Sequence, residues 1–175
     1  EQKRLSAELI AAGADIILGS HPHVVQPYEV IAATAEDGTP RQGIVIYSLG
    51  NFISNQGPEQ GTAEYTDVGV IFSVQVKKHF PAGTIELAVD SAVPTWVHKY
   101  YDNGKRQYRI LPIEETLAAR NDPILTDRQY TMLDGYLQEM TRHLHSMAQA
   151  VSGDGDNDTG TGESSGVGTG ANGDR

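Results

Sequence analysis

Two histidines one residue apart, His21 and His23, are the side chains of this sequence best suited to hold a metal ion. They follow a short apolar run, residues 15–18, which lies between two glycines and is predicted to be a strand buried on both faces. The pair therefore falls in the loop that leaves the carboxyl end of this strand. Pro22 favours extended backbone at His21, so both rings should project to one side from backbones roughly 6–7 Å apart. Imidazoles so placed can share one ion, or serve two ions about 3.5–4 Å apart.

The competing interpretation is that both histidines pack against neighbours or face solvent. Imidazole suits Zn, Fe, Ni and, together with carboxylates, Mn, and a catalytic site needs at least three protein ligands plus a position for water. The nearest carboxylates, Asp15 and Glu29, have simpler explanations as a strand-start residue and a surface group. Asn51 is a candidate oxygen ligand, a candidate donor to a substrate oxyanion, or an ordinary turn residue after a glycine.

The elements that must position these residues begin as one α/β layer. Three apolar residues recur at helical spacing near the start of the chain: Leu5, Leu9 and Ala12. This stripe predicts an amphipathic helix that leads into the first strand. Residues 29–34 and 43–48 are the next predicted strands, and the second is apolar on both faces and therefore central. Ligands collect outside the carboxyl ends of strands in such sheets, so we expect the ends at His23 and Asn51 to face each other.

A second sheet, packed on the first, is expected after the polar loop at residues 54–67. That loop forms either a rim of the site or a flexible connector. Beyond it, apolar residues alternate with polar ones, which is typical of antiparallel strands with one buried face. The predicted strands form two hairpins: residues 70–76 with 85–89, and residues 94–101 with 106–111 across an Asn-Gly turn.

The last part of the sequence predicts a docked helix and a disordered tail. Thr126 with Gln129 fits a capping box that opens a helix with an apolar stripe. Residues 152–175 are almost entirely small and polar, so they cannot bury enough apolar surface to become ordered. The predicted organisation is a domain over residues 1–111, a helical extension over 112–151 and the tail. Three aspartates in the tail resemble the start of a calcium loop, but its glycine and closing glutamate are misplaced, so no calcium site is expected.

Composition narrows the classes of partner. The 175 residues include 23 acidic and 13 basic side chains, a formal net charge of −10, which disfavours nucleic acid or anionic membrane as the main partner. No cysteine is present, which excludes disulfides and thiolate chemistry. No apolar run is long enough to span a bilayer. The sequence opens on Glu1 inside an expected helix, so we expect a fragment or a processed piece.

Two strings of this sequence carry a resemblance to a known family. GADIILGSHPHVVQPYEV, followed by GIVIYSLGNFI, resembles the C-terminal signature of the CapA family, also called the poly-gamma-glutamate biosynthesis protein family. That family is similar in fold to the calcineurin-like metallophosphoesterases, and the resemblance covers residues 1–111. It implies the C-terminal part of an α/β/β/α sandwich with a dinuclear Mn, Zn or Fe site. It also implies a place at the extracytoplasmic face of the cell envelope, in synthesis or export of a poly-gamma-glutamate capsule.

The resemblance also implies roles for single residues. His21 and His23 fall on the last histidine motif of the phosphoesterase site, although Gly-Ser-His-Pro-His is one residue longer than the usual Gly-His-x-His. Asn51 falls on the family's Ser-Leu-Gly-Asn-Phe motif. The N-terminal motifs that supply aspartate ligands and an Asn-His pair have no counterpart here, so we expect an incomplete dinuclear centre.

Three functions follow as expectations. The first is a metal-dependent phosphoesterase-type enzyme of capsule biosynthesis, in which His21 and His23 hold metal and Asn51 positions an anionic group. The second is a non-catalytic assembly or export component of the same fold. The third is an intracellular metal-dependent phosphoesterase. The expected partners are the capsule polymer or a phosphoester substrate, and other capsule-synthesis membrane proteins.

Overall fold

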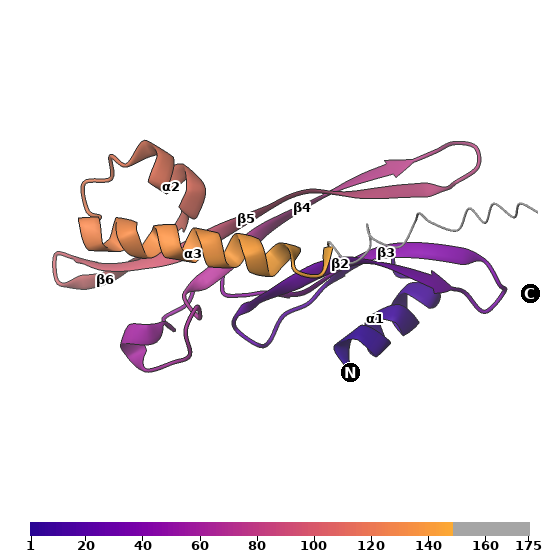
Figure 1. The fold of residues 1–175 in the computed structure, drawn as a ribbon, viewed down its shortest axis with the longest axis horizontal. Helices are drawn as coiled ribbons and strands as arrows, with labels where there is room; N and C mark the ends of the chain where they lie inside the picture. Colours follow the sequence, from indigo (N-terminus) through magenta and orange to yellow (C-terminus); the bar gives the residue numbers. More distant parts are fainter. Residues whose placement is uncertain (149–175) are drawn as a thin grey trace, which may run out of the picture.

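The computed structural model describes residues 1–148 as two three-stranded sheets with helices packed on them (Figure 1). The predicted disordered tail, and the predicted helix beyond residue 148, lie outside the described residues. In chain order the elements are α1 (Gln2–Ala11), β1 (Ile16–Leu18), β2 (Val25–Thr34), β3 (Pro40–Leu49), η1 (Pro58–Gln60), β4 (Val68–Lys78), β5 (Ile85–Asp102), β6 (Lys105–Pro112), α2 (Ile113–Ala119) and α3 (Asp127–His145). The mixed α/β class agrees with the prediction and with a metallophosphoesterase-like sandwich. Within residues 1–148, no helix is both long and apolar enough to cross a bilayer.

The first sheet has the strand order β1-β3-β2, with β1 parallel and β2 antiparallel to β3. Residues 43–48 of β3 are all buried, so the predicted central strand is confirmed. The expectation that residues 15–18 are buried on both faces is wrong. Because β1 is an edge strand with one neighbour, none of its residues is fully buried, and Leu18 is 60% exposed.

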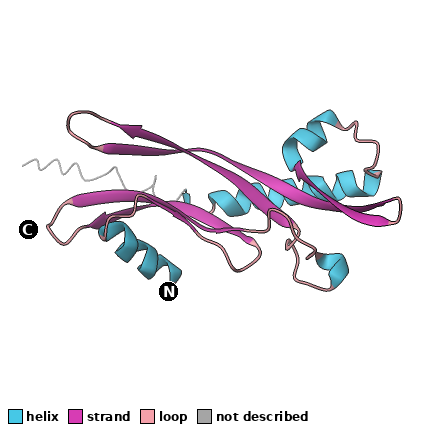
Figure 2. Ribbon diagram, turned by 180° about the vertical axis from the view of Figure 1, so that it is seen from behind, coloured by secondary structure: helices cyan, strands magenta, loops and turns pink. Residues whose placement is uncertain are grey.

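Helix α1 is present, but the predicted stripe does not make its buried face. Its buried residues are Ser6 and Ile10, whereas Leu5 and Leu9 are 48% and 43% exposed. The cause is Gly43 of β3, which lacks the side chain that would occupy the place of Ile10: a Cβ there would lie 2.1 Å from Ile10 Cδ1. Ile10 therefore seats α1 over β2 and β3 (Figure 2), and the leucine stripe faces away from that contact.

Truncating the two faces of α1 is expected to give unequal losses of stability. Ile10→Ala should lower the free energy of unfolding by about 2–5 kcal/mol, because it leaves a cavity above Gly43. The matched change Leu9→Ala should cost less than about 0.5 kcal/mol, because the side chain is already largely in water. Urea unfolding measures both values, and equal losses would show that the leucine stripe is packed.

The second sheet has the order β4-β5-β6 and is antiparallel throughout. The predicted strands at residues 85–89 and 94–101 are one continuous strand, β5, so their separation is wrong. Pro94 is tolerated inside β5 because β6 ends opposite Thr95, which leaves Pro94 with a strand neighbour on one side only. The predicted Asn-Gly turn is confirmed, with positive φ of 48° at Asn103 and 74° at Gly104.

The two sheets and α3 share one hydrophobic core, as the prediction of a second sheet packed on the first requires. Its buried residues come from β2, β3, β4 and α3: Val25, Tyr28, Ile46, Val68, Val70, Met140 and Leu144. Thr126 caps α3, with the reciprocal contacts to Gln129 that the capping box predicts. A smaller cluster of Trp96, Ile113 and Leu133 packs α2 and α3 on β5. The helical region after residue 111 is therefore part of the folded core.

A buried histidine, His98, lies beneath α3 in the second sheet. Its ring stacks between Trp96 and Tyr100, and the residue is 3% exposed. Its Nδ1 accepts a hydrogen bond from Arg109 Nε at 3.0 Å. Burial, aided by the positive charge of Arg109, lowers the pKa of His98 to about 4.

This lowered pKa makes stability depend on pH in a defined window. In the unfolded chain His98 binds a proton below the ordinary imidazole pKa of about 6.5, whereas in the folded chain it stays neutral down to about pH 4. The free energy of unfolding therefore falls as the pH falls through this range. The loss attributable to His98 should reach about 2–3 kcal/mol. The unfolding free energy of wild type and of His98→Gln, measured across this window, isolates the contribution. Identical pH dependence of the two proteins would contradict the buried neutral ring.

Candidate metal site at the strand ends

His21 and His23 lie in the loop between β1 and β2, where both are exposed. Their ring centroids are 6.4 Å apart, with the rings tilted by 43°. The expectation that Pro22 keeps His21 extended is wrong, because His21 has φ 99° and His23 has φ 62°. The loop must reverse direction around the end of β3 within a few residues, since β1 runs parallel and β2 antiparallel to that strand. Left-handed backbone at both histidines makes this reversal, at a cost of about 1–3 kcal/mol for each residue.

Asn51 lies beside the histidines, at the place where the backbones of the two sheets are in contact. Gly50 forms an isolated bridge with Gly69, and the Asn51 N–H donates to Val68 O at 3.1 Å. A Cβ on Gly50 would lie 2.5 Å from Val68 O, and one on Gly69 would lie 2.6 Å from Asn51 O. Only glycine permits this approach. The end of β3 is thereby joined to the start of β4.

The amide of Asn51 is held on both sides. Its Nδ2 donates to Thr66 O at 2.8 Å and to Gln56 Oε1 at 3.1 Å, with a longer contact to His23 O at 3.3 Å. Its Oδ1 lies 2.9 Å from His23 Nδ1. The two predicted strand ends therefore face each other, as expected.

These contacts select one tautomer of His23. The carbonyl oxygen of Thr66 can only accept, so the Asn51 NH₂ group must point toward it and Oδ1 must point toward the histidine. The hydrogen bond then requires a proton on His23 Nδ1. In the neutral ring, Nε2 carries a free lone pair, which is the form in which histidine binds a metal while its other nitrogen is held by a partner.

The separation of the two histidine rings is compatible with two imidazoles that share an ion. With metal–nitrogen bonds of about 2.0–2.1 Å, two rings that share an ion have centroids roughly 5–6 Å apart, close to the separation of this exposed pair. Within residues 1–148, no group of three or more His, Asp or Glu side chains converges in a way that could hold an ion. Asp15 instead pairs with Arg41 at 2.8 Å, and Glu29 accepts a hydrogen bond from the Tyr47 hydroxyl. Further ligands would have to come from outside these residues.

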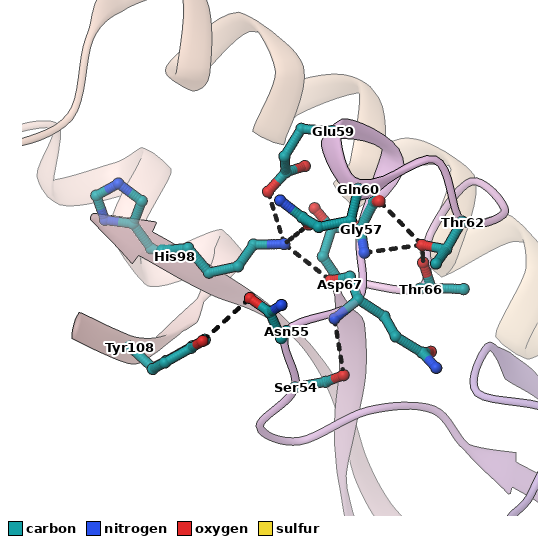
Figure 3. Close-up of polar contacts among 12 residues, drawn as sticks. Ser54, Asn55, Gly57, Glu59, Gln60, Thr62, Thr66, Asp67, His98 and Tyr108 are labelled. Carbon is teal, nitrogen blue, oxygen red and sulfur yellow. Dashed lines mark hydrogen bonds and ion pairs between the residues drawn. The ribbon is translucent and has the colours of Figure 1, made fainter. Parts of the chain in front are cut away.

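The loop at residues 54–67 is an ordered rim of this site. It contains η1, and its partners in the second sheet hold it at two points, which Figure 3 shows with the surrounding polar contacts. Arg106 and Tyr108 donate to Asn55 Oδ1, at 2.7 and 3.0 Å. Although burial opposes it, the ammonium of Lys99 lowers the pKa of Glu59, with which it pairs at 2.6 Å.

Sequence reasoning missed the residues that orient Asn51, namely Gln56 and Thr66, because a polar loop offers no periodic pattern. One signal was present: Lys99 is a lone cation in the apolar run that begins at Trp96. At the last residue of the loop, burial raises the pKa of Asp67, whose Oδ2 accepts a hydrogen bond from the Trp96 indole N–H at 2.8 Å.

Removing the Asn51 amide is expected to release the His23 ring. In metal-free wild-type protein, ¹⁵N NMR above the ordinary imidazole pKa should show His23 mainly protonated at Nδ1. Asn51→Ala should shift it toward the other tautomer and lower the unfolding free energy by about 1–3 kcal/mol, because Thr66 O loses its partner. Gln138→Ala, which removes an exposed contact on α3, serves as the control. A His23 ring protonated at Nε2 in wild type would contradict the assigned geometry.

Comparison with known proteins finds similarity over the part of the chain that contains the candidate site. Residues 1–56 match the family described as "Bacterial capsule synthesis protein PGA_cap". Over 56 residues the chain is 46% identical to "Capsule biosynthesis protein CapA" of Bacillus anthracis and 45% identical to "PGA biosynthesis protein CapA" of Bacillus subtilis (strain 168).

These matches are partial on both sides. They cover 32% of this chain, and 11% and 12% of the two relatives, so the chain spans about a tenth of the length of the relatives it matches. No solved structure matches the chain. The matched segment contains His21, His23 and Asn51, and it confirms the resemblance over that length. The first 56 residues are thus similar to the PGA_cap family of bacterial capsule synthesis proteins and to the two CapA relatives.

Proposed function

We propose that this chain acts in bacterial capsule biosynthesis, associated with the cell envelope, and carries part of a metal-dependent phosphoesterase-type site. The observation that supports this most is the orientation of His23, whose Nδ1 is held by Asn51 while Nε2 remains available. A histidine that merely faces solvent needs no such partner. The capsule-biosynthesis names of the relatives support the biological setting.

In this proposal each residue has one task. His23 supplies Nε2 as a ligand, and His21 supplies a second imidazole from the same loop. Asn51 acts as a positioning residue, because both ends of its amide are engaged within the chain. Asn51 could therefore donate to a substrate oxyanion, as expected from the sequence, only if these contacts break. When bound, a Mn, Zn or Fe ion would activate water and polarise a phosphoester oxygen.

A second candidate function, a non-catalytic assembly or export component of the capsule system, has its own support. A catalytic centre needs at least three protein ligands, and residues 1–148 bring together only the histidine pair. In that case the ordered loop serves to fix the surface around His23. A substrate of the first candidate would be a phosphoester or the capsule polymer itself.

Metal titration is expected to show a half-site. Calorimetry with Mn²⁺ or Zn²⁺ should detect one ion bound more weakly than submicromolar, and His23→Ala should remove this binding. His79→Ala is the matched control, because His79 is an exposed histidine that pairs with Glu86 on a distant hairpin. Submicromolar binding of two ions would show that the centre is complete, and binding insensitive to His23→Ala would refute the ligand role.

Turnover separates the two candidate functions. Hydrolysis of a generic phosphodiester in the presence of Mn²⁺, Zn²⁺ or Fe²⁺, lost on His23→Ala with the fold preserved, would support the enzyme. Absence of turnover in a full-length protein that supplies the remaining metal ligands would support the assembly component, because residues 1–148 by themselves bring together only the histidine pair.

A further inference from the structure

Lys99 is a buried cation whose donors all point into the loop at residues 54–67. Its side chain is 7% exposed and lies near the carboxyl end of β5. The ammonium donates to Gln56 O at 2.8 Å and to Gln60 Oε1 at 2.7 Å, and pairs with Glu59 Oε1 at 2.6 Å. A buried ammonium requires such full satisfaction, because leaving it unpaired costs several kcal/mol, of order 3–5. Three residues of the loop therefore contact the Lys99 ammonium together.

Gly57 shows how tightly the loop is drawn onto this cation. A Cβ at residue 57 would lie 2.4 Å from Lys99 Nζ, so a side chain there would force the ammonium to shift from its present position. The polar groups around Gly57, Glu59 and Gln60 are drawn in Figure 3.

Two short routes lead from this clamp to Asn51. In the first, Gln56, whose carbonyl binds Lys99, uses its side-chain Oε1 to accept from Asn51 Nδ2 at 3.1 Å. In the second, Thr62 bonds to the backbone of Gly57 at 2.9 Å and to Thr66 Oγ1 at 2.7 Å. Thr66 O then accepts from Asn51 Nδ2 at 2.8 Å. The two shorter contacts of the Asn51 NH₂ group, to Gln56 and Thr66, thus both lie in the segment that Lys99 holds.

The other anchor of the loop lacks this connection. Arg106 and Tyr108 hold Asn55 Oδ1 at the exposed side of the loop, and the side chain of Asn55 has no bond to Asn51 among the described residues. The chain therefore offers a matched pair of anchors. One is buried and leads to His23, and the other is exposed and does not.

We propose that Lys99 is a positioning residue for His23. By holding Gln56 and the Gly57–Thr62–Thr66 contacts in place, it fixes the Asn51 amide in the orientation that leaves His23 Nε2 free to bind a ligand. The effect on metal affinity rests on the proposed function, whereas the effect on the tautomer does not. Lys99 neither touches His23 nor contributes a ligand.

The test compares the two anchors by two independent readouts. Metal-free Lys99→Met should lower the fraction of His23 protonated at Nδ1, measured by ¹⁵N NMR above the ordinary imidazole pKa, and Lys99→Arg should restore part of it. Tyr108→Phe should leave the fraction unchanged, because it removes only a contact to Asn55. In calorimetry, Lys99→Met should weaken Mn²⁺ or Zn²⁺ binding about 10–100-fold, the usual effect of losing an outer-shell partner.

The outcomes separate this proposal from the proposed function. A folded Lys99→Met protein with an unchanged His23 tautomer would overturn the positioning role. If that variant does not fold, the double change Gln56→Leu and Thr62→Val interrupts both routes without unpairing the ammonium, and an unchanged His23 tautomer there would overturn the proposal. Should wild type bind no metal while Lys99→Met still shifts the tautomer, the metal function fails and the positioning role stands.

Discussion

The arrangement of the site depends on one constraint, the orientation of the Asn51 amide. A carbonyl oxygen cannot donate, so Thr66 O decides which end of the amide faces the loop and which faces His23. Asn51 can occupy this position only because Gly50 and Gly69 let the backbones of the two sheets meet. From this contact follow the tautomer of His23, the direction of its free nitrogen and the reason for an ordered loop above it.

The physical design of the site is a polar network mounted on rigid strands. Asn51 and His23 stand at the ends of β3 and at the start of β2, and the core formed by both sheets and α3 lies directly behind them. The loop packs Tyr65 against this core. The rest of the loop is held by charge and hydrogen bonds, with the buried ammonium of Lys99 as its main anchor. Sites held by supported hydrogen bonds on strands are placed more accurately than sites on free loops.

Local sequence signals predicted much of the fold. The capping box at Thr126, the Asn-Gly turn and the central strand at residues 43–48 each depend on residues close in sequence, and each is confirmed. The errors share a nonlocal cause. The buried face of α1 is set by the missing side chain of Gly43, and the exposure of β1 is set by strand order, neither of which periodicity contains. At the site, the meeting of His23 with Asn51 followed from strand ends, but the link to Lys99 joins residues far apart in sequence.

The match to the capsule synthesis family covers the two histidines and Asn51 but not Lys99 or the loop after residue 56. The most direct measurement is the anomalous diffraction of a crystal soaked in Zn²⁺ or Co²⁺. The account predicts a peak about 2.0–2.1 Å from His23 Nε2, on the side of His21, with the contact between His23 Nδ1 and Asn51 intact. A peak on His23 Nδ1 or on Asn51 Oδ1, or no peak at either histidine, would contradict it.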